Sequence, residues 1–90
     1  MNYLPIGSVV TLKNSYERLI IIGVNQKSKE NGEKYDYAAC LYPYGYLDGN
    51  ELFLFNNEKI KKVHFKGFFD DEMKDYYEDI EWVNKGGKDE

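Results

Sequence analysis

The single histidine, His64, is the first candidate for acid–base or metal chemistry. A catalytic histidine needs a nucleophile or an orienting acid beside it. On a strand with alternating side chains, the neighbours of His64 on the same face are Lys62 and Lys66, and both are cationic. The pattern therefore predicts a solvated strand histidine that is neither a general base nor a metal ligand.

The single cysteine and the first acids of the last segment also lack the surroundings that catalysis or metal binding needs. Cys40 lies in the apolar run 38–41, where no neighbouring charge would activate the thiol. The consecutive acids Asp70, Asp71 and Glu72 would splay around a helix axis instead of converging on a cation. We predict a packing cysteine, a helix-start role for the acids, and a non-enzymatic chain without a metal or cofactor site.

The most unusual segment is the run from Tyr42 to Tyr46. It places Tyr42, Tyr44 and Tyr46 at alternate positions, with a proline and a glycine between them. Rigid amphipathic tyrosines of this kind are enriched in binding surfaces, so these three are the candidate protein-binding residues. They could dock a proline-rich peptide or stack bases. The sequence favours the other interpretation, structural packing, in which the tyrosines cover one end of a barrel together with the last helix.

The charge of the chain is divided between two regions. Residues 67–90 carry nine acids and three lysines, a balance of −6, whereas residues 1–66 carry seven acids and nine basic residues, a balance of +2. The chain has one arginine, Arg18, and its net charge is −4. Nucleic acid is therefore an unlikely partner on these grounds, because the acidic segment repels phosphates.

Ninety residues with 42% hydrophobic content predict one globular domain over residues 1–90. The first residues lack the basic and apolar regions of a signal peptide. The longest aliphatic run, Leu19–Ile22, is far shorter than a membrane span. We expect a cytoplasmic protein without membrane contact, in which Cys40 is a reduced thiol.

Apolar alternation and turn residues predict a β body over residues 4–69. Five strands are expected, at 8–12, 19–24, 35–42, 51–55 and 61–66. Gly23 indicates a bulge or bend, and the polar residues 25–34 are expected to form a long loop. In the last strand, Val63 and Phe65 are predicted to point inward, and residues 62, 64 and 66 outward.

The spacing of apolar residues changes to that of a helix after Phe69. The positions at 73, 76, 77, 80 and 83 form one helix face, which predicts an amphipathic helix over 70–85 and a frayed tail over 86–90. The fold class is therefore mostly β (α+β). It is a small, strongly bent antiparallel sheet or SH3-like partly open barrel of about five strands with a C-terminal helix. A flat meander crossed by the helix is the alternative.

Several segments, taken together and in order, resemble a small family of low-GC Gram-positive bacteria. These are the opening Leu-Pro-Ile-Gly-Ser from Leu4, the run Leu19–Gly23, the Tyr-Pro-Tyr-Gly-Tyr segment from Tyr42 and the stretch 55–68. The family is catalogued as domain of unknown function 4176, and the resemblance covers about residues 4–80. It implies no catalytic or ligand residues. It does imply a genetic context, because such proteins are often encoded beside type VII secretion genes and their toxin substrates.

The expected function is a non-enzymatic protein-interaction module. The context implied by the resemblance makes it a cytosolic accessory, adaptor or chaperone-like factor for type VII secretion toxins, with an immunity role as a variant. The partner would be such a toxin or its targeting protein. The alternative is a small nucleic-acid-binding barrel with a regulatory role. Pairing of two copies through edge strands stays open.

Overall fold

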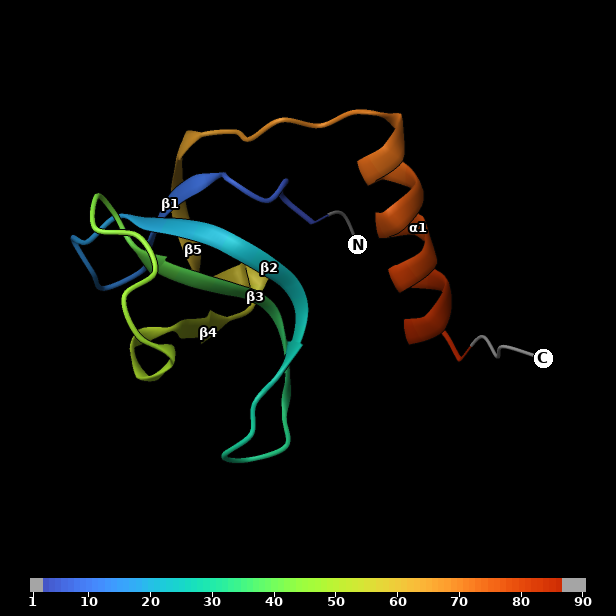
Figure 1. Cartoon of the computed structure of the whole chain (residues 1–90), viewed down its shortest axis with the longest axis horizontal. Helices are drawn as coiled ribbons and strands as arrows, with labels where there is room; N and C mark the ends of the chain where they lie inside the picture. The colour runs from blue at the N-terminus through green and yellow to red at the C-terminus, as the bar shows by residue number, and fades with distance from the viewer. Residues whose placement is uncertain (1–2, 87–90) are drawn as a thin grey trace.

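The computed structural model of the chain describes residues 3–86, which form one antiparallel sheet and one α-helix (Figure 1). The elements are β1 (Val9–Leu12), β2 (Leu19–Lys27), β3 (Lys34–Leu41), η1 (Gly49–Glu51), β4 (Phe53–Phe55), η2 (Asn57–Lys59), β5 (Ile60–Phe65) and α1 (Asp71–Asn84). The sheet has five strands in the order β4-β3-β2-β1-β5. The predicted fold class, mostly β with a C-terminal helix, is confirmed.

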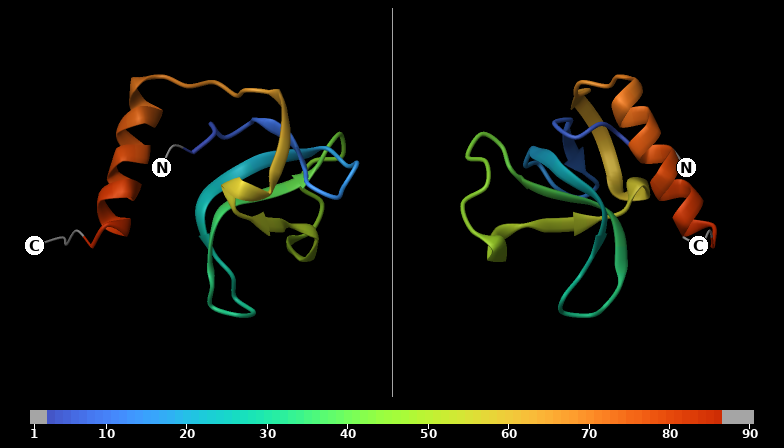
Figure 2. Two further views of the ribbon diagram at one scale, coloured as in Figure 1. Left: turned by 180° about the vertical axis from the view of Figure 1, so that it is seen from behind. Right: turned by 45° about the vertical axis from the view of Figure 1, so that its right-hand side comes forward.

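The sheet is strongly bent and does not close. β2 is the longest strand and curves through the molecule, pairing with β1 at its start and with β3 along its length (Figure 2). The register of β2 against β3 shifts between Ile21 and Gly23, which is the bulge or bend that the glycine predicts. β4 and β5 are the two edges of the sheet. The result is one strongly bent, unclosed sheet and not a flat meander.

The core lies inside the bend of the sheet and extends to the inner face of α1. Ile21 and Tyr37 are fully buried at its centre. The other members of the cluster are Tyr3, Val10, Leu19, Val24, Ala39, Phe55, Tyr77 and Ile80. Burying an aliphatic side chain of this size contributes about 1.5–3 kcal/mol, so these few residues supply much of the drive to fold.

The prediction that Val63 and Phe65 both point inward is wrong. Val63 pairs with the buried Val10 but remains 43% exposed, because β5 is an edge strand. The register then shifts between Val9 and Val10, so that Phe65 pairs with Val9 and is 60% exposed. A bulge breaks the two-residue alternation on which the prediction depends.

The loop between β2 and β3 is shorter than the ten residues predicted. β2 continues to Lys27 and β3 begins at Lys34, with Gln26 paired to Tyr35. Polar side chains do not prevent pairing, because the ladder uses backbone groups only. Ser28 then closes the turn by accepting the amide hydrogen of Glu30 at 3.1 Å.

Helix α1 begins and ends close to the predicted positions. Asp70 is the N-cap and accepts the amide hydrogen of Met73 at 3.0 Å, while Lys85 is the C-cap. Of the predicted apolar face, Tyr77 and Ile80 are buried and Met73 is half-buried. The predicted tail at 86–90 lies outside the described residues apart from Gly86.

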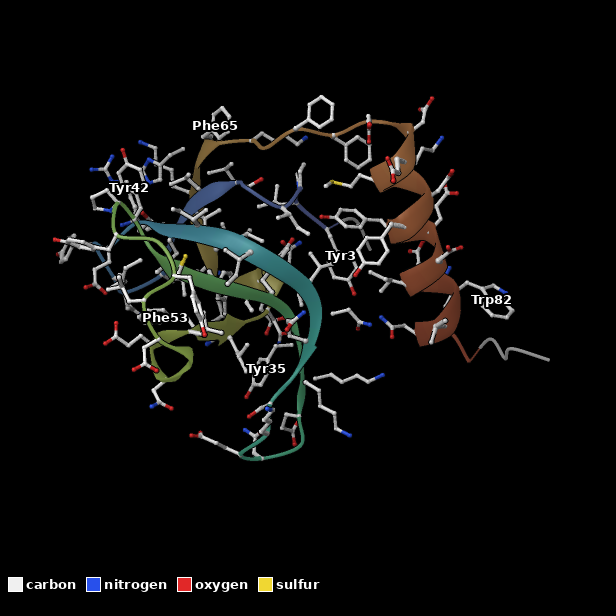
Figure 3. All side chains as sticks on the ribbon, viewed as in Figure 1. Tyr3, Tyr35, Tyr42, Phe53, Phe65 and Trp82 are labelled. Carbon is white, nitrogen blue, oxygen red and sulfur yellow. The ribbon has the colours of Figure 1, made fainter. Side chains whose placement is uncertain are left out.

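The helix is attached to the sheet through the N-terminal segment. Tyr3 lies between the sheet and α1 (Figure 3), and its ring meets that of Tyr77 edge-on at 5.5 Å between centroids. The Tyr77 hydroxyl donates to the carbonyl oxygen of Leu4 at 2.8 Å. Asn84 donates to the Tyr3 hydroxyl at 3.3 Å. The segment 3–5 therefore links the helix to the sheet.

Candidate protein-binding surface

The register of β2 against β3 determines where the predicted binding residues lie. Leu19 pairs with Leu41, so the turn before β2 and the loop after β3 meet at the same end of the sheet. The amide hydrogen of Tyr42 is donated to the carbonyl oxygen of Arg18 at 2.9 Å. The Arg18 guanidinium carbon also lies 4.9 Å from the centre of the Tyr42 ring, which is a cation–π geometry.

This end of the molecule exposes a group of large apolar side chains that we call the tyrosine surface. Its members are Tyr16 (97% exposed), Tyr42 (42%), Tyr44 (69%), Tyr46 (62%) and Leu47 (65%). They come from the two loops that meet beside Arg18. A concentration of amphipathic aromatics with both ring and hydroxyl available is typical of protein-binding surfaces.

The loop that carries most of these tyrosines is held by its own backbone. The amide hydrogen of Gly45 is donated to the carbonyl oxygen of Leu41 at 2.8 Å, and Gly45 has φ of +78°, where a side chain would be strained. Further along, the Asp48 carboxylate accepts the amide hydrogen of Asn50 at 2.9 Å. A loop with these local constraints loses little additional conformational freedom when a partner binds.

The structure does not support the alternative in which the tyrosines pack with the helix. Tyr42 and its loop lie at the end of the sheet opposite α1 (Figures 1 and 3). The tyrosines that do pack against α1 or the inner core are Tyr3, Tyr37 and Tyr77. Whether Tyr42, Tyr44 and Tyr46 bind a protein stays a prediction.

The other residues singled out from the sequence do not come together. The His64 side chain lies 2.8 Å from Thr11, between Nε2 and Oγ1, on a mostly exposed strand. Cys40 is a buried free thiol, as predicted. Asp70 caps α1, with Asp71 and Glu72 in its first turn, as predicted. Within residues 3–86, no group of three or more histidine, cysteine, aspartate or glutamate side chains could hold a metal ion.

Sequence reasoning missed two contributors to the tyrosine surface. Tyr16 and Leu47 lie outside the Tyr42–Tyr46 motif. Tyr16 lies near the motif because the turn before β2 meets the loop after β3, where Leu19 pairs with Leu41. The available signal was the isolated Tyr16 in a polar turn, where a strand-forming aromatic has no core to enter. The sequence shows the charge of Arg18 but does not show that Arg18 lies beside Tyr42.

A hollow lies between the N-terminal segment and α1. It has a volume of about 510 Å³, and Tyr3, Pro5, Phe69 and Tyr77 form its apolar wall. Burial raises the pKa of Tyr77 to about 12. Its rim carries two lysines and two glutamates, Lys66, Lys74, Glu78 and Glu81, so it favours neither sign of ligand charge. This hollow therefore defines no ligand class.

No helix within the described part of the chain is long and apolar enough to cross a membrane. The fold and the surface together define a small, mostly β domain with one bent, unclosed sheet, an exposed aromatic end and an acidic C-terminal helix. The family model described as domain of unknown function (DUF4176) matches residues 3–75, and the chain belongs to that family. No curated protein and no solved structure matches the chain.

Proposed function

We propose that this protein is a non-enzymatic interaction module that binds a partner protein through the tyrosine surface. The observation that carries the proposal is the concentration of five exposed large apolar side chains on two adjoining loops. Arg18, stacked on Tyr42, adds a cation to the same surface. Tyrosine and arginine are enriched among the residues that contribute most to protein binding.

The chemistry of the rest of the molecule agrees with a binding role. His64 faces a threonine hydroxyl, Cys40 is buried, and neither has an acid or base partner among the described residues. The loops that carry the tyrosine surface extend from a rigid sheet, which is how binding loops are commonly positioned.

The biological context in this proposal is that of an accessory, adaptor or chaperone-like factor for type VII secretion toxins in the cytoplasm. Its support is the family membership together with the gene neighbourhood that the resemblance implies. An immunity role differs from an adaptor role in one measurable respect. An immunity protein suppresses the toxicity of its partner, whereas an adaptor is needed for the partner's export.

The test is a tagged pull-down from the native host with three forms of the protein, read by mass spectrometry. The wild-type protein and the variant Trp82→Ala should recover the same partner, and the double variant Tyr44→Ala with Tyr46→Ala should lose it. Trp82 is the matched control because it is 52% exposed and points away from the sheet on α1 (Figure 3). Equal recovery by all three forms would remove the tyrosine surface from the proposal.

A small nucleic-acid-binding barrel is the second candidate. The observation that favours it is the run 59–69, which holds four lysines and no acid and includes the exposed Phe65 and Phe68. A shift of single-stranded RNA at low salt, reversed by added salt, would support this candidate. Absence of binding at low salt would eliminate it, because exposed charges are least screened there.

A further inference from the structure

The outer edge of β5 has no strand beside it among the described residues. β5 is the last strand in the sheet order, and β1 occupies only its inner edge. Its six residues, Ile60–Phe65, span about 20 Å at about 3.3 Å per residue. An unpaired edge of this length presents backbone donors and acceptors that can take an added strand.

The side chains along this edge are exposed and basic. Lys61 and Lys62 lie within β5, and Lys59 and Lys66 lie on either side of it. The run 59–69 therefore carries a charge of +4 in a chain of net charge −4. None of these four lysines forms an ion pair with any residue of the described region 3–86. The positive charge of the edge is thus available to a partner.

The same edge keeps exposed apolar side chains between its lysines. Val63 is 43% exposed and Phe65 is 60% exposed. Lysines on an edge strand prevent two copies of that strand from pairing, because like charges would lie opposite each other. They do not repel an acidic strand. The lysines therefore select against a second β5 and in favour of a strand that carries acids.

The other edge of the sheet is a poorer site for an added strand. β4 has only three residues, Phe53–Phe55, and contains no charged side chain. The β5 edge is also better matched to a peptide than to a nucleic acid. An unpaired strand edge hydrogen-bonds to a peptide backbone, and a longer polyanion would come closer to α1, whose segment 70–84 carries seven acids and one lysine.

We propose that the outer edge of β5 accepts an extended acidic segment of a partner protein as an added β-strand. The backbone of the segment pairs with β5. Lys62 and Val63 pair with the neighbouring residues Thr11 and Val10 and so lie on opposite faces of the sheet, which places the acids of the segment near Lys62 and its apolar residues against Val63. This site shares no residue with the tyrosine surface and does not depend on it.

The test uses a synthetic eight-residue peptide that alternates glutamate and valine, titrated into the isotopically labelled protein. At about 20 mM salt, amide resonances of β5 should shift, and the shifts should weaken as salt is added. Two control peptides isolate the two contributions. Lysine in place of glutamate should abolish binding, and N-methylation of alternate residues should abolish it by removing the backbone donors.

Two variants test the lysines directly. Lys61→Glu with Lys62→Glu should weaken peptide binding by about tenfold or more. The control variant, Lys27→Glu with Lys29→Glu, reverses the charge of two other lysines. Both lie at exposed positions by the β2–β3 turn, so this variant should leave peptide binding unchanged. Thermal melts of both variants confirm that they fold. These measurements do not involve Tyr44 or Tyr46, so failure here is distinct from failure of the tyrosine surface.

Three outcomes would overturn the proposal. The first is no shift of any β5 resonance at millimolar peptide concentration, and the second is equal binding of the N-methylated peptide. The third is binding of single-stranded RNA to the same lysines without competition from the acidic peptide. That result would assign the edge to nucleic acid instead.

Discussion

Tyrosines have two separate roles in this molecule, and Tyr37 illustrates the first. Its hydroxyl accepts the amide hydrogen of Leu4 and donates to Asn57 Oδ1, both at 2.8 Å. Its ring packs against Tyr3 and Phe55. One residue thus joins the N-terminal segment, β3 and η2. The exposed Tyr44 makes no comparable contact within residues 3–86, so it is available for binding.

This division predicts losses of stability of different size for two truncations. Ile21→Ala should lower the free energy of unfolding by about 2–5 kcal/mol, because the side chain is fully buried and leaves a cavity. Tyr44→Ala should lower it by less, because the side chain is 69% exposed. Thermal and denaturant melts measure both changes. A larger loss for Tyr44→Ala would show that its loop is part of the stabilising core.

The buried tyrosines also predict how stability depends on pH. Burial raises the pKa of Tyr3 and Tyr37, and it raises the pKa of Tyr77 from 10.0 to about 12. Below pH 10 these hydroxyls are neutral in the folded and the unfolded chain. Between pH 10 and about 12 the tyrosine hydroxyls ionise in the unfolded chain before they ionise in the folded one. The free energy of unfolding should therefore fall as pH rises through this range.

Thermal melts from pH 9 upward, each at about constant ionic strength, measure that fall. Tyr77→Phe keeps the ring but has no proton to lose, so its melting temperature should fall less steeply with pH. Its stability at neutral pH should be lower than wild type, because the carbonyl oxygen of Leu4 loses a hydrogen bond. An identical pH slope in both proteins would contradict the assignment to Tyr77.

At the scale of single residues, local chemistry was enough for some predictions and not for others. The burial of Cys40 follows from its apolar neighbours, and the capping by Asp70 follows from its place before a helical pattern. The orientation of Phe65 could not be predicted, because it depends on a register shift between β5 and β1, in which the adjacent residues Val9 and Val10 pair with Phe65 and Val63 and His64 is skipped. Such a shift is decided by pairing and leaves no mark in the strand's own sequence.

Among the elements, α1 depends most on a few contacts. It meets the rest of the molecule largely through Tyr3, Leu4 and the side chains of Tyr77 and Asn84. Two of the five residues of its predicted apolar face are only partly covered, since Tyr76 and Val83 are each 49% exposed. Its attachment should therefore fail before the sheet does.

Tyr3→Ala should release α1 while the sheet stays folded. The variant loses the edge-on contact with Tyr77 and the hydrogen bond from Asn84. Amide hydrogen exchange in α1 should then be faster by about tenfold or more, with little change at the centres of β2 and β3. Tyr76→Ala, on the exposed part of the same helix, is the control. Equal acceleration in the helix and the sheet would mean that the two unfold together.

Element boundaries were easiest to predict where the signal is local. The helix follows from its cap and its apolar spacing, and the bulge near Gly23 follows from a glycine in a buried strand. The extension of β2 and β3 into residues 25–34 was missed. Backbone pairing continued through polar side chains, and the sequence pattern reports only side-chain burial.

On the scale of the whole molecule, three surfaces can be distinguished. The tyrosine surface lies at one end, α1 with its acids lies at the other, and the basic strand β5 forms a free edge of the sheet between β1 and solvent. The sequence shows the Tyr42–Tyr46 motif and predicts the acidic helix. It could not place them at opposite ends, because that arrangement follows from the pairing of β2 with β3.

The most direct test of the central claim is to map the binding of the recovered partner on the labelled protein. Purified partner should shift amide resonances of residues 14–18 and 42–47, and Tyr44→Ala with Tyr46→Ala should lower the affinity by about tenfold or more while Trp82→Ala leaves it unchanged. Shifts confined to α1, with full affinity retained by the tyrosine double variant, would contradict a binding role for the tyrosine surface.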